Sequence, residues 1–567
     1  MTVSKKHSLL PLFLSGLLLG SLLFVLVYGL NVLDVTNDSW IFSQPDPDIE
    51  QHYIGWCHFR HAPWRFPLGL VDSLSWPFSI SILWTDSMPP VALFFKLFRS
   101  LLPKTFQYIG WYGLSSFALM GGFSCLLLEK VTGSGRIALA GSVAYILSFP
   151  IQQRMFYHTT LTAHWLIILA LYLWISDFLK QDLRKVCLIW GLISLYAAML
   201  HPYLWIMAAM ILCFSLLEEL IITKKWLKPV LTGLSCIASA VIGLWAIGAF
   251  YGDVKVKESS GVFEGNMNTF FNPMGEGALL INLPIQDGFQ YEGYGYLGAG
   301  IILMAGFGLG LMLYELAKRR KPLPDLIKNH LRAFLIFIAG LLFFNMAIFP
   351  KYSFNDKIIF RFPMNDLLEL VLGIFRSNGR FIWPAAYIVM TFAFWAISRF
   401  LCPKKGFIVR EGILMGLTAF FMMIQLLDLS NLIRDKHDTF TENYEEEVCD
   451  LDNENLLSVL PRYKHLVMAY DDHLDNMKFA YFASRYGLTI NRFYFARGIN
   501  DAIEAELERH RSLAANGKAP TDCLYLMKEE AYNGGWKDFP LYFYDLKGTI
   551  VGSKEPLPGI IPISYPY

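Results

Sequence analysis

The chain has 567 residues, of which 54% are hydrophobic and 16% aromatic, whereas only 17% are charged. Soluble domains carry about 25% charged residues, so this composition indicates a protein with many membrane-spanning helices. The formal net charge is +1, and a chain without a basic surplus is not expected to bind nucleic acid. The eight cysteines show no CxxC or CxxH spacing, so a structural zinc site has no support.

The first predicted element is the apolar segment from Leu9 to Leu30, which follows a short basic start. Its length of about 22 residues suits a spanning helix better than the shorter core of a signal peptide. No small-residue cleavage site follows it. We therefore expect residues 1–30 to remain in the protein as the first transmembrane helix.

Residues 31–105 form a polar loop. Its titratable residues are dense from the stretch PDPDIEQHYIGW at 45–56 onward. Asp46 and Asp48 are either turn and helix-capping residues or carboxylates of a site. Helical spacing places Asp48 and His52 on one face. Partial desolvation would move the carboxylate pKa toward neutrality, as a general base for a hydroxyl acceptor requires.

The segment 88–102 of this loop, MPPVALFFKLFRSLL, is apolar but too short to span a membrane. We expect an interfacial or re-entrant helix there, because the segment also carries Lys96 and Arg99. Asp86, just before it, either caps this helix or acts as a second site carboxylate. A lipid-linked phosphate would suit the free N–H groups at the start of the helix.

The other predicted spans bring the total to about eleven. They lie at 106–128, 136–152, 161–178, 186–202, 203–222, 229–251, 296–316, 333–350, 382–401 and 408–427. Lysines and arginines gather in alternate connections, on the same side as the N-terminus. The positive-inside rule makes that side cytoplasmic, and an odd number of spans then places residues 428–567 outside.

Residues 428–567 are predicted to form an extracytoplasmic mixed α/β domain, because HLVMAYDD and CLYLMKEEAY suit short strands. About 140 residues are enough for a small core. Cys449 and Cys523 either form a disulfide there or remain thiols. The predicted fold class is a polytopic α-helical membrane protein, with spans 2–11 within residues 106–427 and this domain after them.

The outer connections carry the remaining candidate residues. Arginine binds phosphate bidentately, although a single arginine is often a snorkelling residue or a structural ion pair. His201 either closes a helix or binds substrate, and Tyr291 belongs either to an interfacial belt or to a sugar-stacking surface. The candidates are Arg60, His61, Arg154, His158, His164, His201, Tyr291, Glu292, Arg376 and Arg380.

Six segments, taken in order, resemble a known architecture. They are DIEQHYIGWCHFRHAPWRFPLGL, TDSMPPVALFFKLF, RMFYHTTLTAHW, HPYLW, QYEGYGYLG and FRSNGRFIWP. Together they are similar to an uncharacterised family of bacterial integral membrane proteins with the GT-C fold. That is the fold of membrane glycosyltransferases that use lipid-phosphate sugar donors. The C-terminal domain resembles no family that we can name.

The resemblance implies an inverting sugar transfer in a bacterial inner membrane, from a polyprenyl-phosphate donor to a glycan, lipid-linked or protein acceptor. It implies Asp48 as the base, with His52 beside it and Asp86 as the second acidic residue of the loop. Donor phosphate would be held by Arg376 and Arg380 with Arg154 or His158. Further substrate contacts are expected from Asp46, Arg60, His61, His201, Tyr291 and Glu292.

No cofactor is expected to be required, and no metal site is assigned. Some members of the wider fold use a divalent metal, which Asp46 or Asp48 with Glu292 would be able to hold. Two other classes remain open. A lipid or glycan flippase would show an inverted repeat, and no repeat is visible. A non-catalytic membrane scaffold leaves the His, Arg and Asp residues of five loops unexplained.

Overall fold

The computed structural model describes residues 9–44, 48–252, 263–319, 330–365, 369, 375–401, 407–442, 444 and 449–565. The chain divides into two units. The helical unit comprises Met1–Val35, Tyr108–Val241 and Lys257–Glu442, and the mixed unit comprises Thr36–Gln107, Ile242–Val256 and Asn443–Tyr567. The first polar loop and the C-terminal region therefore belong to the same unit, although most of the chain separates them.

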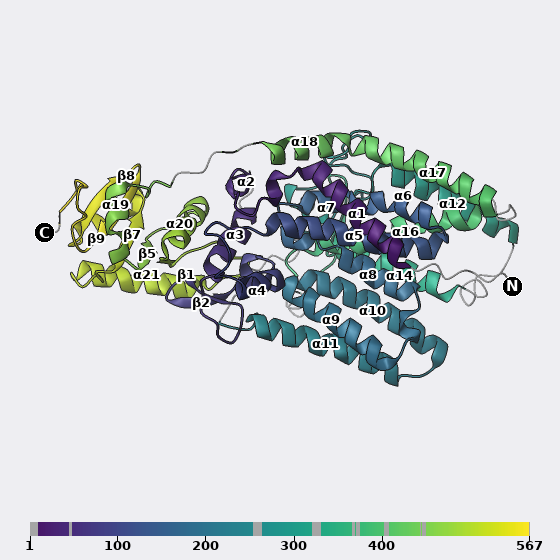
Figure 1. Cartoon of the computed structure of the whole chain (residues 1–567), viewed down its shortest axis with the longest axis horizontal. Coiled ribbons are helices and arrows are strands. Elements are labelled where there is room, and N and C mark those ends of the chain that lie inside the picture. Colours follow the sequence, from purple (N-terminus) through teal and green to yellow (C-terminus); the bar gives the residue numbers. More distant parts are fainter. Residues whose placement is uncertain are drawn as a thin grey trace. The chain divides into compact units, whose positions relative to one another are not determined.

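The helical unit consists mainly of long apolar helices (Figure 1). Their bounds are α1 Leu9–Tyr28, α5 Ile109–Thr132, α6 Gly135–Ile146, α7 Phe149–Arg154, α8 Trp165–Ile175, α9 Leu183–Leu200, α10 Pro202–Thr223, α11 Leu227–Ile247, α12 Ala299–Arg319, α14 Leu331–Ile348, α16 Ile382–Phe400, α17 Phe407–Asp428 and α18 Ser430–Thr441. The last residues of α11 belong to the mixed unit. A hairpin of β3 Lys351–Phe354 and β4 Lys357–Arg361 follows α14.

Nine of the described helices are long and apolar enough to cross a membrane. They are α1, α5, α9, α10, α11, α12, α14, α16 with its preceding turn, and α17. This agrees with a membrane-embedded protein. Of these nine, α16 with its preceding turn is the most buried, at 83% over its apolar window against 22% for α1. Helix α12 packs against both α16 and α17 (Figure 1).

The other two predicted spans are shorter in the structure. The segment predicted at 136–152 is divided between α6 and α7, because Pro150 lies in the first turn of α7. A proline there has no N–H to donate and would clash with the preceding turn, so a single helix cannot run through it. The segment predicted at 161–178 contains only the short helix α8, which follows a 3-10 turn at Thr159–Thr162.

Helices α1 and α5 approach closely because glycines face one another across their contact. A Cβ atom on Gly16 would lie 2.4 Å from the carbonyl oxygen of Gly121, and one on Gly121 would lie 2.1 Å from that of Gly16. Small residues let helix backbones touch, and van der Waals packing of this kind stabilises helix pairs in lipid.

The C-terminal part of the mixed unit contains a five-stranded sheet in the order β6-β5-β7-β9-β8. Strand β5 runs parallel to β6 and β7, whereas β9 is antiparallel to β7 and β8. The bounds are α19 Glu454–Val459, β5 His465–Met468, α20 His473–Tyr486, β6 Thr489–Ile490, α21 Asn500–Ala515, β7 Cys523–Met527, α22 Glu529–Asn533, β8 Tyr542–Leu546 and β9 Thr549–Ser553. The two predicted strands are confirmed as β5 and β7. Cys449 and Cys523 are buried thiols without a disulfide.

The first polar loop folds against this sheet. It contains α2 Ser39–Phe42, α3 Asp48–Phe59, β1 Leu70–Ser75, β2 Phe78–Ser81 and α4 Pro89–Leu97. Trp76, between β1 and β2, stacks on His465 with ring centroids 3.9 Å apart, and its backbone N–H donates to the Ile490 carbonyl at 3.0 Å. On α3, His58 Nε2 lies 2.8 Å from the carbonyl oxygen of Ala480 in α20. The C-terminal region is therefore part of the core that orders the loop.

Replacing Gly121 with alanine should destabilise the protein, because the new methyl group would overlap the Gly16 carbonyl of α1. Overpacking of this kind costs about 1–3 kcal/mol. The matched control is Gly306→Ala in α12, where no atom lies within 4 Å of the added Cβ. That change should be neutral or stabilising, because glycine in a helix interior costs about 0.5–1 kcal/mol. Thermal unfolding in detergent gives the midpoints of both variants. Equal midpoints would contradict the close contact of Gly121 with Gly16.

Candidate functional site

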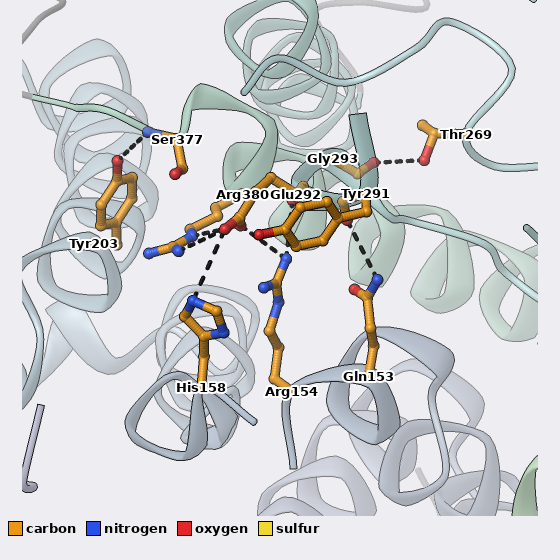
Figure 2. A network of polar contacts seen from close by, with 10 residues as sticks. All are labelled: Gln153, Arg154, His158, Tyr203, Thr269, Tyr291, Glu292, Gly293, Ser377 and Arg380. Atoms are coloured by element: carbon orange, nitrogen blue, oxygen red, sulfur yellow. Dashed lines mark hydrogen bonds and ion pairs between the residues drawn. The ribbon is translucent and has the colours of Figure 1, made fainter. Parts of the chain in front are cut away.

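A buried ionic site of the helical unit surrounds Glu292, which lies in the 3-10 turn Gly288–Gly293 (Figure 2). Glu292 Oε2 accepts hydrogen bonds from Arg154 Nη2 at 2.9 Å and from Arg380 Nε at 2.8 Å. Its Oε1 accepts from Arg380 Nη2 at 2.9 Å. Arg154 ends α7 and Arg380 lies in the 3-10 turn Asn378–Phe381. Three segments distant in sequence therefore meet at one carboxylate.

Glycines beside Arg380 and Glu292 let these two segments approach each other. Gly379 precedes Arg380, and a Cβ on it would lie 2.5 Å from the amide nitrogen of Gly293. A Cβ on Gly293 would in turn lie 2.2 Å from the Cα of Gly265. The Thr269 hydroxyl also donates to the Gly293 carbonyl at 2.6 Å (Figure 2). Glycine therefore provides the backbone contact that holds Arg380 and Glu292 together.

The charges of this site do not cancel. Burial alone would raise the pKa of Glu292, but Arg154 and Arg380 outweigh this and hold the pKa of the carboxyl well below its usual range. His158 Nε2 lies 4.0 Å from Glu292 Oε1. Glu292 is 2% exposed, so an ionised carboxylate and two guanidinium groups are buried together. The net positive charge favours an anionic ligand.

Several N–H groups beside Glu292 have no hydrogen-bond partner among the described residues. They include Nε and Nη1 of Arg154 and Nε1 of Trp383, and His164 Nε2 is also unpartnered. The Arg154 guanidinium lies 5.6 Å from the Trp383 ring, whose centroid is 4.4 Å from that of His164. Buried polar groups normally have partners. Unpartnered groups gathered in one place therefore indicate a position for ordered water or an oxygen-rich ligand.

The start of α10 contributes an aromatic residue, Tyr203, to the site. His201 caps this helix, since its Nδ1 accepts a hydrogen bond from the Tyr203 amide at 3.3 Å. His201 thus has the role at a helix end that was one of its two alternatives, and its substrate contact stays a prediction. The Tyr203 ring lies 5.1 Å from the Arg380 guanidinium, and its hydroxyl accepts from the Ser377 amide at 2.7 Å (Figure 2). Arg376 is exposed and lies over the Phe263 ring at 4.9 Å.

Tyr291 contributes both its backbone and its ring. Its carbonyl oxygen accepts a hydrogen bond from Gln153 Nε2 at 3.3 Å, as Figure 2 shows. Its ring lies 5.8 Å from the Arg154 guanidinium. Tyr291 therefore packs against Arg154. The sequence analysis did not select Trp383 as a residue of this site. Its position one helical turn after Arg380 is the only feature of the sequence that indicates it.

The first-loop candidates lie in the mixed unit. Asp48 is the first residue of α3 and is partly buried. His52 follows one turn later and is 1% exposed, and its Nδ1 has no hydrogen-bond partner in the described part of the chain. Burial lowers the pKa of His52 to about 3, so its imidazole is neutral at physiological pH. Asp48 and His52 share a helix face as predicted.

Asp86 is not the N-cap residue of α4. It lies in the left-handed region with φ 50° and closes the preceding 3-10 turn, whereas Met88 is the N-cap of α4. A Cβ on Gly55 would lie 2.3 Å from Thr85 Oγ1, so this turn packs against the middle of α3. Asp48 is seven residues before Gly55, or about 10 Å along the helix.

The remaining loop candidates have other surroundings. Arg60 is buried and donates to the carbonyl oxygens of Lys104 and Pro103, both at 2.9 Å. Its guanidinium therefore holds the chain after α4 in place, and a substrate contact of Arg60 stays a prediction. His61 is exposed. Asp46 lies outside the described residues.

A metal site does not emerge from the part of the chain that the structure describes, where no three His, Cys, Asp or Glu residues come together. Both oxygens of Glu292 already accept hydrogen bonds from guanidinium groups. Glu292 is thus placed as the counter-ion of two arginines, and a metal shared with Asp46 or Asp48 stays a prediction.

Two family models match the chain. One, described as "Domain of unknown function (DUF6311)", matches residues 17–430. The other, the "DUF6311 C-terminal domain", matches residues 456–553. A search of curated proteins found no match. The first match extends from α1 to the start of α18 and includes every residue of the Glu292 site.

Glu292→Gln should lower the stability of the protein strongly. The substitution keeps the shape of the side chain but leaves Arg154 and Arg380 buried without a counter-ion, and breaking a buried pair in this way costs about 3–5 kcal/mol. Glu508→Gln is the control, because the Glu508 side chain is 69% exposed. Substitutions on the surface usually change the free energy of unfolding by no more than about 0.5 kcal/mol. The unfolding midpoints of both variants are measured in detergent. Equal midpoints would contradict the role of Glu292 as the counter-ion of Arg154 and Arg380.

The stability of the mixed unit should fall as the pH drops below about 6.5. The folded state keeps His52 and His58 neutral, because burial lowers their pKa values to about 3 and about 4. In the unfolded state both imidazoles take up a proton below about pH 6.5. Each histidine therefore lowers the free energy of unfolding by about 1.4 kcal/mol per pH unit below that value. In His52→Leu the dependence between about pH 6.5 and 4.5 should be less steep, because one of the buried histidines is removed. Thermal unfolding in detergent at several pH values tests this, and an unchanged slope would exclude His52 as a source.

Proposed function

The chain belongs to the DUF6311 family, and from the ionic site within the matched region we propose that it is a membrane glycosyltransferase of the GT-C type. It transfers a sugar from a polyprenyl-phosphate donor to an acceptor hydroxyl on the extracytoplasmic face of the membrane. The acceptor is a glycan, a lipid-linked molecule or a protein.

The observation that carries the proposal is the buried, net positive group of Arg154, Arg380 and Glu292. Nε and Nη1 of Arg154 have no partner among the described residues. A guanidinium presents its N–H groups in a planar fork that matches two oxygens of a phosphate. Glu292 fixes the orientation of both arginines without neutralising them, so a phosphate monoester is the ligand that best complements the charge and the unpartnered donors.

The proposed membrane arrangement follows from the apolar helices and the positions of lysine and arginine. We place the N-terminus in the cytoplasm of a bacterial cell and count α6 with α7, and the 3-10 turn with α8, as two further crossings. The connections that hold Arg154, Glu292 and Arg380 then open to the outer side of the inner membrane, as do the polar loop and the C-terminal region.

In the proposed reaction the acceptor oxygen attacks C1 of the sugar and its proton passes to a carboxylate, for which the resemblance implies Asp48. The bond between C1 and the phosphate oxygen breaks, and its electron pair stays on the phosphate. The displacement inverts the configuration at C1. Arg154 and Arg380 stabilise the charge that develops on the leaving phosphate. No metal enters this scheme.

A lipid or glycan transporter is the second candidate, and the break between α6 and α7 favours it. Transporter sites often lie at interrupted helices, where charged groups face a cavity. Arg154 is the last residue of α7, so its position fits that pattern as well. A transporter would move the polyprenyl-phosphate sugar across the bilayer without breaking its glycosidic bond, which separates the two candidates experimentally.

Purified protein should release polyprenyl phosphate from at least one member of a panel of polyprenyl-phosphate sugars when membrane-extracted acceptor is present, with or without EDTA. Arg154→Gln should lower turnover about 100-fold or more, because it removes charge that stabilises the leaving group. Asp48→Asn should lower it by a similar factor, whereas Glu508→Gln should not. Folding is checked by the unfolding midpoint of each variant. Translocation of an intact donor in liposomes, without its consumption, would favour the transporter.

A further inference from the structure

The mixed unit has an exposed apolar surface formed by the segment after α3 and by α4. Its large side chains are Trp64, Phe66, Phe94, Leu97, Phe98 and Leu101, which are between 43% and 81% exposed. We call this surface the apolar platform. Contiguous apolar surface of this kind usually marks a site of contact with a partner or a membrane.

Buried contacts hold the two parts of the apolar platform together. Lys96 of α4 is fully buried, and its Nζ lies 3.8 Å from the centroid of the Phe59 ring and 4.8 Å from that of Trp64. Arg99 Nη1 donates to the carbonyl oxygens of Arg60 at 3.3 Å and Ala62 at 2.9 Å. The segment 60–64 and α4 therefore form one surface.

Basic groups predominate around the apolar platform, although Asp72 forms an ion pair with Arg65, next to Phe66. The stretches 58–70 and 87–108 contain lysine, arginine and histidine but no aspartate or glutamate. Lys104 is exposed and Arg99 is partly buried. Apolar side chains surrounded by basic groups are typical of a surface that enters the boundary between acyl chains and anionic headgroups.

The apolar platform is joined to two candidate membrane spans. The chain passes from Leu101 to the start of α5 at Ile109 within a few residues. On its other side, the ring of Phe66 lies 4.5 Å from that of Trp245 at the end of α11, and the Leu68 amide donates to the Ala246 carbonyl at 2.7 Å. Both α5 and α11 are long and apolar enough to span. Tryptophan at the end of a span is typical of the membrane–water interface.

From these observations we infer that the apolar platform binds membrane phospholipid. Phe94, Leu97, Phe98 and Leu101 enter the acyl-chain boundary, and Arg99 and Lys104 contact lipid phosphate groups. The inference does not depend on the proposed glycosyltransferase activity, because it rests on a surface that contains none of the residues of the Glu292 site.

The test uses the full-length protein in native membranes, with a photoactivatable benzophenone amino acid replacing Phe98 or Leu101. Leu18 of α1, which is 62% exposed on a candidate span, is the positive control. Leu474 of α20, which is 67% exposed in the same mixed unit, is the negative control. After irradiation, mass spectrometry should find phospholipid adducts at positions 98 and 101 at no less than about half the yield at 18, and none at 474.

Adducts of positions 98 and 101 with another protein, or a lipid yield no higher than at 474, would overturn the inference. The charge contribution is tested in nanodiscs of purely zwitterionic or partly anionic phospholipid. The adduct yield at 101 should rise at least about twofold with anionic lipid, and Lys104→Gln should reduce this rise. A yield that is independent of lipid charge would overturn the role given to the basic residues.

Discussion

The ion pairs of Glu292 with Arg154 and Arg380 are the interaction on which the rest of the helical unit depends. A carboxylate that is 2% exposed is tolerated only with charged partners, because removing an ion from water costs several kcal/mol. The partners come from α7 and from the turn before α16, so one buried charge fixes the positions of both segments. The surplus guanidinium charge of the same structural element is the basis of the anion site that we propose. Stability and the proposed function therefore have a common origin.

A second constraint orders the first polar loop. Tyr53 and Tyr481 both donate to Asp38 Oδ2, at 2.8 and 2.6 Å, which joins α3 to α20. Gln51 Nε2 donates to the Tyr494 carbonyl at 2.8 Å, only three residues from Asp48. The backbone around the proposed base is therefore held by the C-terminal region. A truncation that removed this region would expose the buried face of α3, so the C-terminal region has a structural role whatever it binds.

Much of the fold could be predicted from the sequence, because long apolar runs identify helices such as α1 and α12 directly. The break at Pro150 could not, since the apolar character continues through it. For the site, the sequence identified Arg154, His158, Glu292 and Arg380 as candidates by residue type. It did not reveal that Glu292 pairs with both arginines, because these partners lie 138 and 88 residues away and no local pattern links them. Trp383 was missed because an indole in an apolar helix resembles any core residue.

The most direct test of the central claim is the binding of a short-chain polyprenyl phosphate, compared with the corresponding polyprenol, to purified protein. The wild type should bind the phosphate at least about tenfold more tightly, because hydrogen bonds to a charged group contribute about 1.5–3 kcal/mol. Arg154→Gln should lose this preference, whereas Arg434→Gln, at an exposed position of α18, should keep it. Equal affinities for the two lipids in the wild type, or an unchanged preference in Arg154→Gln, would contradict the assignment of the Glu292 site to a phosphate.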